Sequence, residues 1–240
     1  MDAHRFAQVT GVPGCDLFLS RMSAIEELSR PFRFVLRLIG ESSEIEASEI
    51  LGRPLSVELE LSAESKRSFS GYVAEFGLAE TSKRHATYVA VLRPSLWMLQ
   101  HNSNCRIFKG KTVPEVVKQI LRDWGLSDFE DLLVGSYRQR EYLVQYRESD
   151  FSFLSRIMEQ EGIYYYFKHT SQSHSLVLAD SNSCHESVVG YENLPYYPRS
   201  NEDRRERDHI DSWKTKRQIV AGAYAARDFN FETPKANLQS

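Results

Sequence analysis

The chain has 240 residues, of which 41% are hydrophobic, enough to bury one large core or two small ones. Its formal net charge is −3, and the run near Arg204 has mixed signs, so nothing points to a nucleic-acid partner. The N-terminal residues lack the continuous apolar core of a secretory signal, and no run approaches the roughly 20 apolar residues of a membrane span. We therefore expect synthesis in the cytoplasm and no stable membrane insertion.

The first ninety or so residues have the alternation of an antiparallel β unit. Residues 55–61 alternate between apolar and polar, which predicts a strand with one face in the core and one in water. Residues 67–79 and 87–92 supply two more strands, and Gly71 marks a bulge or a close approach. Between residues 32 and 39 one face is wholly apolar: Phe32, Phe34, Leu36 and Leu38. Short strands separated by polar turns favour a small barrel or sandwich.

Two helical segments follow this β unit. Residues 94–99 predict a short helix that begins with proline. Thr112 and Glu115 have the spacing of a capping box, and Gly125 is placed to end the longer helix that they start. Trp124 continues the apolar stripe of this helix, so we expect it in the core rather than as a stacking platform for a ligand. The stripe comprises Val113, Val116, Val117, Ile120, Leu121 and Trp124.

A strand, a capped helix and a second strand are predicted within residues 142–169. The aromatic and β-branched residues 142–146 suit a half-buried strand. Ser149 or Asp150 is placed to cap the helix, and Asp150 is better explained as a cap than as a catalytic acid. Gly162 ends the helix, because glycine enters the left-handed conformation at little cost. The apolar stripe of the helix comprises Phe151, Leu154, Ile157 and Met158.

Residues 163–167 are apolar or aromatic on both faces of the strand that they predict. Such a strand is covered on both sides, either by the rest of the chain or by another subunit. The internal core is the favoured alternative, because tyrosine hydroxyls find partners inside a barrel as easily as at an interface. Tyr164 and Tyr166, on one face, are our candidates for a contact with another subunit.

The last third of the chain is predicted to be less regular. The polar residues 170–173 form a turn, and residues 174–179 return as a strand that completes a β-hairpin. Residues 199–211 are strongly polar and predict an exposed loop. Two further strands are expected around 210–220 and 223–231, with a glycine at the turn between them.

The sequence contains no familiar catalytic motif. It has no G-x-S-x-G elbow, no H-E-x-x-H, no P-loop and no G-x-G-x-x-G, so we predict no catalytic residue and no cofactor. His169, His174, Cys184 and His185 are residue types that bind zinc and would partly converge in the hairpin, but their spacing matches no finger pattern. Histidines beside a turn are commonly solvated, and we predict no metal site. Cys184 and His185 are a poor nucleophile and base pair, because adjacent residues in a strand rarely point at each other, and a hydrolase is a minor alternative.

The cysteines indicate a reducing environment. Cys15, Cys105 and Cys184 are three in number and widely scattered. A disulfide framework requires pairs and is typical of short secreted chains. We therefore expect free thiols.

One run, YRESDFSFLSRIMEQEGIYYYF at residues 146–167, carries a family resemblance, and six shorter runs support it. They are LSRPFRFVLRL from Leu28, ILGRPLSVELEL from Ile50, RPSLWML from Arg93, RIFKGKTVPEVV from Arg106, YENLPYYP from Tyr191 and GAYAARDFNFETP from Gly222. In this order they resemble the VgrG spike proteins of type VI secretion systems, within their N-terminal region that is similar to the phage tail hub and to the phage late control gene D proteins. The resemblance extends over nearly the whole chain.

The resemblance implies a mainly β fold with inserted helices, built from two barrel-like or sandwich β units of the phage tail-hub type. We expect a first barrel-like unit at 1–93, and a helix-containing segment with the hairpin of a second unit at 94–200. An exposed loop and the start of further strands are expected at 201–240. Family members continue into an OB-fold neck and a β-helical needle, and no periodic β-helix repeat occurs in this sequence.

The resemblance also implies a structural role without enzymatic activity. Family members are homotrimers whose paired barrel-like domains build a ring of approximate sixfold symmetry on the hexameric tube protein Hcp. Expected partners are therefore Hcp, baseplate proteins, a tip protein and effectors or their adaptors. The implied function is to cap the tube and to take part in puncture and effector delivery, with secretion through the apparatus without a signal peptide. A docking module for an effector or adaptor is the alternative.

Overall fold

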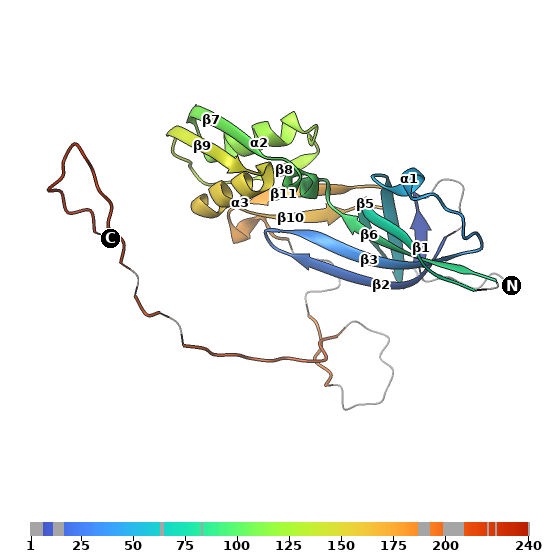
Figure 1. The fold of residues 1–240 in the computed structure, drawn as a ribbon. Coiled ribbons are helices and arrows are strands. Elements are labelled where there is room, and N and C mark those ends of the chain that lie inside the picture. Colours follow the sequence, from blue (N-terminus) through green and yellow to red (C-terminus); the bar gives the residue numbers. More distant parts are fainter. Residues whose placement is uncertain are drawn as a thin grey trace. The chain divides into compact units, whose positions relative to one another are not determined.

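The computed structural model describes residues 7–11, 17–62, 65–82, 84–186, 193–198, 209–219, 221–223 and 225–239. Contacts divide the chain into two units, Met1–His185 and Glu186–Ser240, which are described separately. Within the described residues, all helices and strands lie in the first unit (Figure 1). Cys15 and the predicted loop as far as residue 208 lie outside the described residues.

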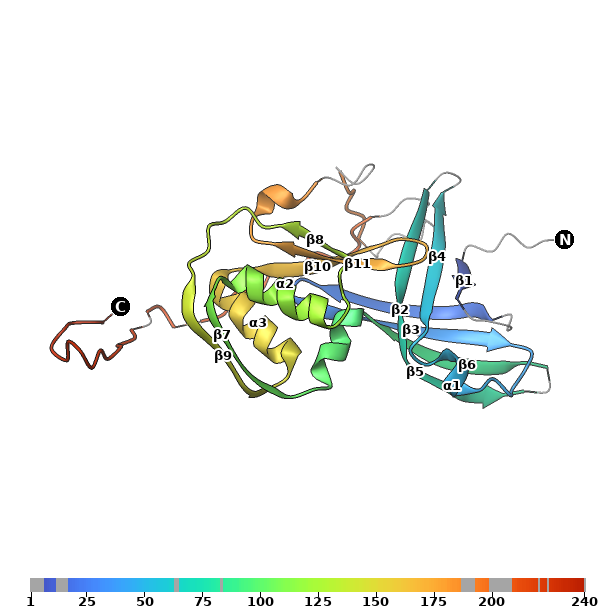
Figure 2. The same cartoon turned by 90° about the horizontal axis from the view of Figure 1, so that it is seen from above.

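Six antiparallel strands of the first unit form one curled sheet (Figures 1 and 2). The edge strands of this sheet also lie close to each other, so that it closes part of the way to a barrel. This confirms the predicted barrel-like, mainly β fold. In sheet order the strands are β1 (Ala7–Thr10), β4 (Pro54–Ser62), β5 (Ser65–Thr81), β6 (Ala86–Arg93), β3 (Arg30–Gly40) and β2 (Phe18–Glu27).

The alternation predicted for β3 is confirmed by its burial. Phe34, Leu36 and Leu38 are fully buried on the concave face, whereas the residues between them are partly exposed. Their contacts with β5 and β6 residues make the first hydrophobic core. A one-turn helix, α1 (Ala47–Ile50), adds the buried side chain of Ile50 to this core.

A second hydrophobic core is built from helices and two small sheets. A short 3-10 helix, η1 (Ser95–Gln100), and the helices α2 (Val113–Asp123) and α3 (Asp150–Glu161) pack in it. One sheet is an antiparallel ribbon of β7 (Asn104–Lys111) and β9 (Arg140–Glu148). The other has the order β10 (Tyr164–His169), β11 (His174–Ala179) and β8 (Phe129–Leu132). A second 3-10 helix, η2 (Asn182–Cys184), follows β11.

Both long helices start and end as the sequence predicts. In α2, Thr112 Oγ1 accepts a hydrogen bond from the backbone N–H of Glu115, and the Glu115 carboxylate accepts one from the Thr112 N–H at 2.7 Å. In α3, Ser149 rather than Asp150 is the N-cap, because its hydroxyl accepts the N–H of Ser152 at 3.1 Å. Gly162 ends α3 in the left-handed region, at φ 71°.

The ribbon strand β9 is half-buried, as the sequence predicts. Tyr142 and Tyr146 are 55% and 65% exposed, whereas Leu143 and Gln145 are buried. A two-stranded ribbon has one face on the core and one in solvent, and the register places the tyrosines on the outer face. The predicted strand is confirmed, but its aromatic side chains lie outside.

The two strands predicted at 210–220 and 223–231 are wrong for the described residues of the second unit. That part of the chain has only isolated bridges, which join Tyr196 with Ile210 and Arg227 with Gln239. Phe229 and Phe231 are 72% and 79% exposed, and no strand in the described part of this unit pairs with their backbone groups. Among the described residues, no helix has the length and apolar character to cross a membrane.

The close approach predicted at Gly71 is confirmed and can be tested. A Cβ at this position would lie 3.0 Å from Phe32 Cε2 and 3.1 Å from Leu92 Cβ, both in the first core. We expect Gly71→Ala to lower the free energy of unfolding by about 1–3 kcal/mol, because the packed core must shift. The control is Gly77→Ala on the same strand, where a Cβ meets nothing within 4 Å. Equal urea midpoints for the two variants would contradict this explanation.

Candidate functional site

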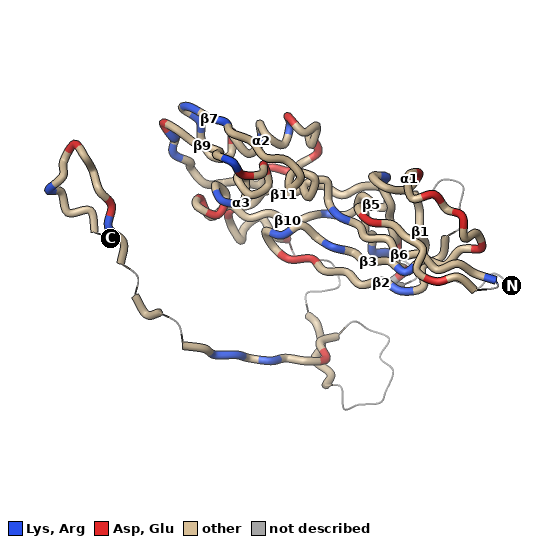
Figure 3. The backbone as a smooth tube through the Cα atoms, in the orientation of Figure 1, with Lys and Arg blue, Asp and Glu red and all other residues tan. Residues whose placement is uncertain are grey.

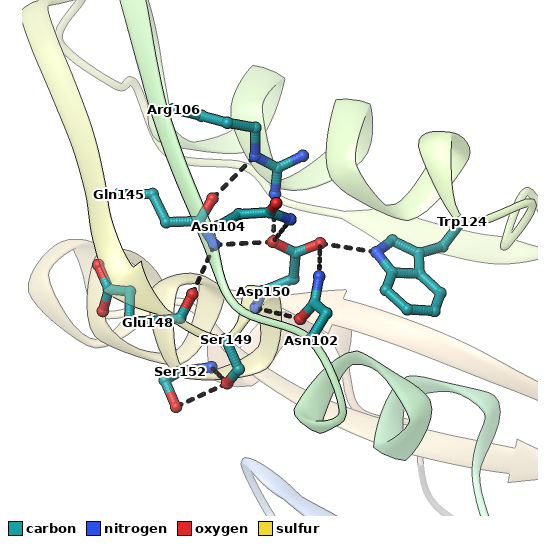
Figure 4. A network of polar contacts seen from close by, with 9 residues as sticks. All are labelled: Asn102, Asn104, Arg106, Trp124, Gln145, Glu148, Ser149, Asp150 and Ser152. Carbon is teal, nitrogen blue, oxygen red and sulfur yellow. Dashed lines mark hydrogen bonds and ion pairs between the residues drawn. The ribbon is translucent and has the colours of Figure 1, made fainter.

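Among the described residues, the carboxylate of Asp150, at the first residue of α3, makes the largest number of polar contacts (Figure 4). The residue is only 1% exposed. Four neutral donors and one cation converge on its two oxygens, from the link before β7, from β7 and β9, and from the end of α2. They are Asn102 Nδ2 at 2.7 Å, Asn104 Nδ2 at 3.2 Å, Gln145 Nε2 at 2.7 Å, Trp124 Nε1 at 2.7 Å and the Arg106 guanidinium.

The network around Asp150 joins α3 to the ribbon and to the end of α2. Arg106 lies on β7 and Gln145 on β9, and Arg106 Nε also donates to Gln145 Oε1 at 2.8 Å. Asn102, in the link between η1 and β7, both donates to the carboxylate and accepts the backbone N–H of Asp150 at 3.0 Å. The carboxylate therefore holds five segments in one arrangement.

The sequence did not predict this role for Asp150 or for Trp124. Trp124 is 38% exposed, so the prediction of a core residue was wrong: it follows the last turn of α2, where its indole N–H turns toward Asp150. Asn102, in the link before β7, and Asn104 and Arg106, at the start of β7, are polar at every second position, and this spacing is the sequence signal for a buried anion.

The surroundings of Asp150 decide what its carboxylate can do. Burial by itself would raise its pKa, but the hydrogen bonds from Trp124, Gln145 and Asn102 outweigh that effect and hold the pKa below its usual value. Its oxygens are occupied by donors of the protein itself. An ionised carboxylate with these partners has no proton to give and little capacity to take one, so it acts as a scaffold.

A second polar cluster joins the two cores at the tip of the β10–β11 hairpin. His169 and His174 lie directly opposite each other in this hairpin, as predicted, with ring centroids 6.1 Å apart. Both rings pack on Phe32 of the first core, at centroid distances of 4.9 and 5.2 Å. The expectation of solvated histidines was wrong, because the curled sheet covers the tip of the hairpin.

Backbone N–H groups of β5 and η1 fix the two histidines. His169 Nδ1 accepts the N–H of Ser70 at 3.1 Å, and its Nε2 lies 3.0 Å from Glu26 Oε1. His174 Nε2 accepts the N–H of Ser95 at 3.1 Å. Burial, and then the nearby His169, lower the pKa of His174 to about 4, so its imidazole is neutral at physiological pH.

The hairpin also covers a strand face that was predicted to lie in water. Ser56 on β4 is 3% exposed and Ser70 on β5 is 1% exposed, and their hydroxyls are hydrogen-bonded at 3.0 Å. The Ser70 hydroxyl also donates to the carbonyl of Thr170 in the hairpin turn. On the other side, the Ser29 N–H donates to the Tyr165 carbonyl at 2.8 Å. Together these bonds fasten the second core to the first.

The four residues considered for zinc do not converge. His169 and His174 lie at the tip of the hairpin, whereas Cys184 and His185 contact Tyr164 at its opposite end. Across the described ranges, no group of three or more His, Cys, Asp or Glu side chains is placed to hold a metal ion. Cys105 and Cys184 are free thiols.

Tyr164 and Tyr166 have partners within the chain. The Tyr164 hydroxyl lies 2.9 Å from the Ser181 carbonyl and 2.8 Å from His185 Nε2, and the hydrogen bond with Cys184 raises the pKa of Tyr164 to about 12. The ring of Tyr166 packs on His185 at a centroid distance of 5.4 Å. Both side chains are partly exposed, and their contact with another subunit stays a prediction.

Replacing Asp150 tests its structural role. We expect Asp150→Asn to lower the free energy of unfolding by about 3 kcal/mol, because the amide leaves Arg106 without its anion and points N–H groups at other donors. Asp131→Asn is the control, since Asp131 pairs with Lys118 at the surface and its loss should cost no more than about 1 kcal/mol. If the two variants lose the same free energy of unfolding in urea titrations, the burial of Asp150 does not increase its contribution to stability.

The low pKa of His174 predicts a pH dependence. The unfolded chain binds a proton at His174 near pH 6.5 and the folded chain only near pH 4, so protonation favours unfolding as the pH falls between these values. The neutral His174 contributes fully to the free energy of unfolding above pH 6.5, and about 3 kcal/mol of this contribution is lost by pH 4. In His174→Gln this part of the pH dependence should disappear from urea titrations. An unchanged slope would contradict the neutral, buried imidazole.

Comparison with known proteins places this architecture in a family. The family model of the phage tail baseplate hub (GPD) matches residues 25–240. The type VI secretion system spike protein VgrG1a of Pseudomonas aeruginosa is 44% identical over 240 residues, which are 100% of this chain and 37% of that protein. VgrG1b of the same organism is 44% identical over 98% of this chain and 32% of its own length. This chain thus spans about a third of the length of these curated relatives.

Solved structures agree with this assignment. The Escherichia coli c3393 protein is described as a component of the type VI secretion system with structural similarity to the T4 bacteriophage tail proteins gp27 and gp5. It matches with a TM-score of 0.68 and 25% identity, over 81% of this chain and 52% of that one. A VgrG in a Francisella complex with PdpA has the same fold, with a TM-score of 0.50 and 13% identity over 76% of this chain and 30% of that one. The chain therefore belongs to the phage tail baseplate hub family, among the VgrG spike proteins of type VI secretion systems.

Proposed function

We propose that this chain is a structural hub component of a contractile type VI secretion spike. In this role it caps the Hcp tube and takes part in puncture and effector delivery. The match to the hub family over residues 25–240, together with the curled barrel-like sheet, carries the proposal. The function is mechanical, so it depends on shape and rigidity rather than on a reactive group.

The polar interior supports a mechanical function. The Asp150 carboxylate and the two hairpin histidines are engaged with protein donors and acceptors, so that their chemistry serves to fix backbone elements. A part that transmits the force of a contracting sheath needs its elements locked together in this way. The proposal therefore includes no catalytic residue, no cofactor and no metal.

Symmetry explains how such a hub could meet a tube. A trimer with two barrel-like domains per chain presents six similar faces to a hexamer. We propose that residues 1–93 form one such domain, that 94–200 carry helices and the hairpin toward a second, and that 201–240 begin its further strands. Baseplate proteins and a tip protein are the other proposed partners. The chain would assemble in the cytoplasm and leave through the apparatus without a signal peptide.

A second candidate function is a docking module for an effector or its adaptor. The outer face of the β7–β9 ribbon favours it, because Ile107, Val144 and Tyr146 are 61%, 46% and 65% exposed on neighbouring strands. Apolar patches of this kind mark surfaces that bind other proteins. Such docking is compatible with a hub and would occupy a different face from the tube.

Binding experiments separate the two functions. We expect the purified chain to bind Hcp hexamers in sedimentation experiments, and Ile107→Glu with Val144→Glu to leave this binding unchanged. The same double variant should lose any effector or adaptor that the chain captures. A chain that binds effectors but shows no association with Hcp at any concentration would contradict the capping role and favour the docking module.

The proposed subunit contact at Tyr164 and Tyr166 is tested with the same preparations. The double variant Tyr164→Ser and Tyr166→Ser should weaken self-association in light scattering while the monomer stays folded by circular dichroism. A monomer that unfolds would instead make both residues part of the core, joined to it through Ser181 and His185.

A further inference from the structure

The outer face of the β7–β9 ribbon has an apolar centre and a cation at each end. At the centre Ile107 and Val144 lie opposite each other and are 61% and 46% exposed. At one end Lys109 lies opposite Tyr142, and its ammonium group is 5.5 Å from the centroid of the tyrosine ring. Figure 3 shows Lys and Arg along both strands of the ribbon. No aspartate or glutamate occupies the outer positions, which are 105, 107, 109, 142, 144 and 146.

A bulge in the backbone of β9 places the second cation. Cys105 on β7 pairs with Tyr146, but the preceding residue of β7 pairs with residue 148, so Arg147 is an extra residue in β9. Arg147 takes the left-handed conformation, at φ 51°, which costs free energy in any residue other than glycine. Its guanidinium lies 5.2 Å from the centroid of the Tyr146 ring. The strained residue therefore carries its charge to the end of the outer face that lies opposite Lys109.

Both cations are able to bind an anion from another protein. Lys109 and Arg147 are exposed, and no ion pair between described residues includes either of them. Arg140, on the same strand as Arg147, is by contrast paired with Glu161. Packing on a tyrosine ring leaves the N–H groups of each cation able to donate to a carboxylate. An anionic partner therefore gains charge-assisted hydrogen bonds at both ends of the face.

The distance between the two ends sets the pattern that a partner requires. The end pairs of the face are 105 with 146 and 109 with 142, and four residues of extended strand span about 13 Å. In an extended partner, alternate side chains lie on one face, so two carboxylates at this spacing flank one apolar side chain. We propose that the ribbon docks an acidic segment of another protein with this pattern. Its apolar anchor packs on Ile107 and Val144, and its carboxylates bind the two cations.

This inference rests on the docking function proposed for the ribbon and names the chemistry of the partner. An anionic membrane is the competing occupant, because tyrosines and cations also suit a lipid surface. Proteins that recognise anionic lipid present clusters of about four to eight Lys or Arg, whereas this face presents only Lys109 and Arg147. A peptide segment needs one carboxylate for each cation, so the charge of the face matches a protein partner.

Selection from a displayed library of short peptides tests the charge preference. We expect the wild-type chain to enrich peptides in which Asp or Glu flanks an apolar residue at the proposed spacing. Lys109→Glu with Arg147→Glu should reverse the preference and enrich Lys and Arg at those positions, because both ends of the face become anionic. The control of equal charge change is Lys214→Glu with Lys216→Glu, at exposed positions of the second unit, which should select as the wild type does.

The affinity of an enriched peptide, measured by fluorescence anisotropy, separates binding from folding. We expect Arg147→Gly to weaken binding about tenfold, because one charge-assisted hydrogen bond is lost. Glycine also relieves the left-handed strain, so the same variant should melt at a higher temperature. Weaker binding by a more stable chain excludes unfolding as the cause. Ile107→Glu with Val144→Glu should abolish binding of the peptide.

Further outcomes decide between this inference and its competitors. Selection without a charge preference, or the same peptides from the charge-reversed ribbon, overturns it. If no peptide is enriched but the chain binds phosphatidylserine vesicles through the same cations, a lipid surface is the occupant and the inference is wrong. Hcp binding lost in the ribbon variants would also overturn it, because the tube would then occupy this face. A chain that selects acidic peptides but never binds Hcp supports the inference and contradicts only the capping role.

Discussion

The buried carboxylate of Asp150 sets the position of everything that follows it in the first unit. Five donors from the η1–β7 link, β7, β9 and the end of α2 converge on one charge, and removing the carboxylate leaves these donors without their acceptor. Helix α3, which begins at Asp150, leads through Gly162 directly into the β10–β11 hairpin. The hairpin in turn places its two histidines and Phe167 against the first core. One anion therefore fixes, step by step, how the two cores are joined.

This chain of contacts suits a part that bears load. Apolar packing resists compression but does not fix the relative orientation of the packed elements. Hydrogen bonds to a buried charge have a preferred geometry and do fix it. Here the polar groups lie where elements that are distant in the sequence meet. One such place is the start of α3, and the other lies between the hairpin and β5 and η1. The outer face of the ribbon, with Ile107, Val144 and Tyr146 exposed, remains available for partners. The buried hydrogen bonds thus make the unit rigid, and its exposed faces are left to bind other proteins.

Local signals in the sequence predicted local structure well. The capping box at Thr112, the terminating Gly162 and the alternation in β3 each depend on interactions within a few residues, so their patterns were sufficient. Long-range partners were not predictable. Asp150 looked like a cap because its donors lie up to 48 residues away, and His174 looked solvated because the sheet that buries it is distant in sequence. The strands expected beyond residue 210 failed for the same reason, since a strand requires a neighbour.

The central claim is that the two cores of the first unit form one rigid body, and hydrogen exchange along a urea titration tests it most directly. Amides of β3 report the first core and amides of α2 report the second. The account predicts that both sets lose protection in one transition with the same free energy, because Asp150 and the hairpin couple the cores. Two transitions at separate urea concentrations would show that each core unfolds alone, and would contradict it.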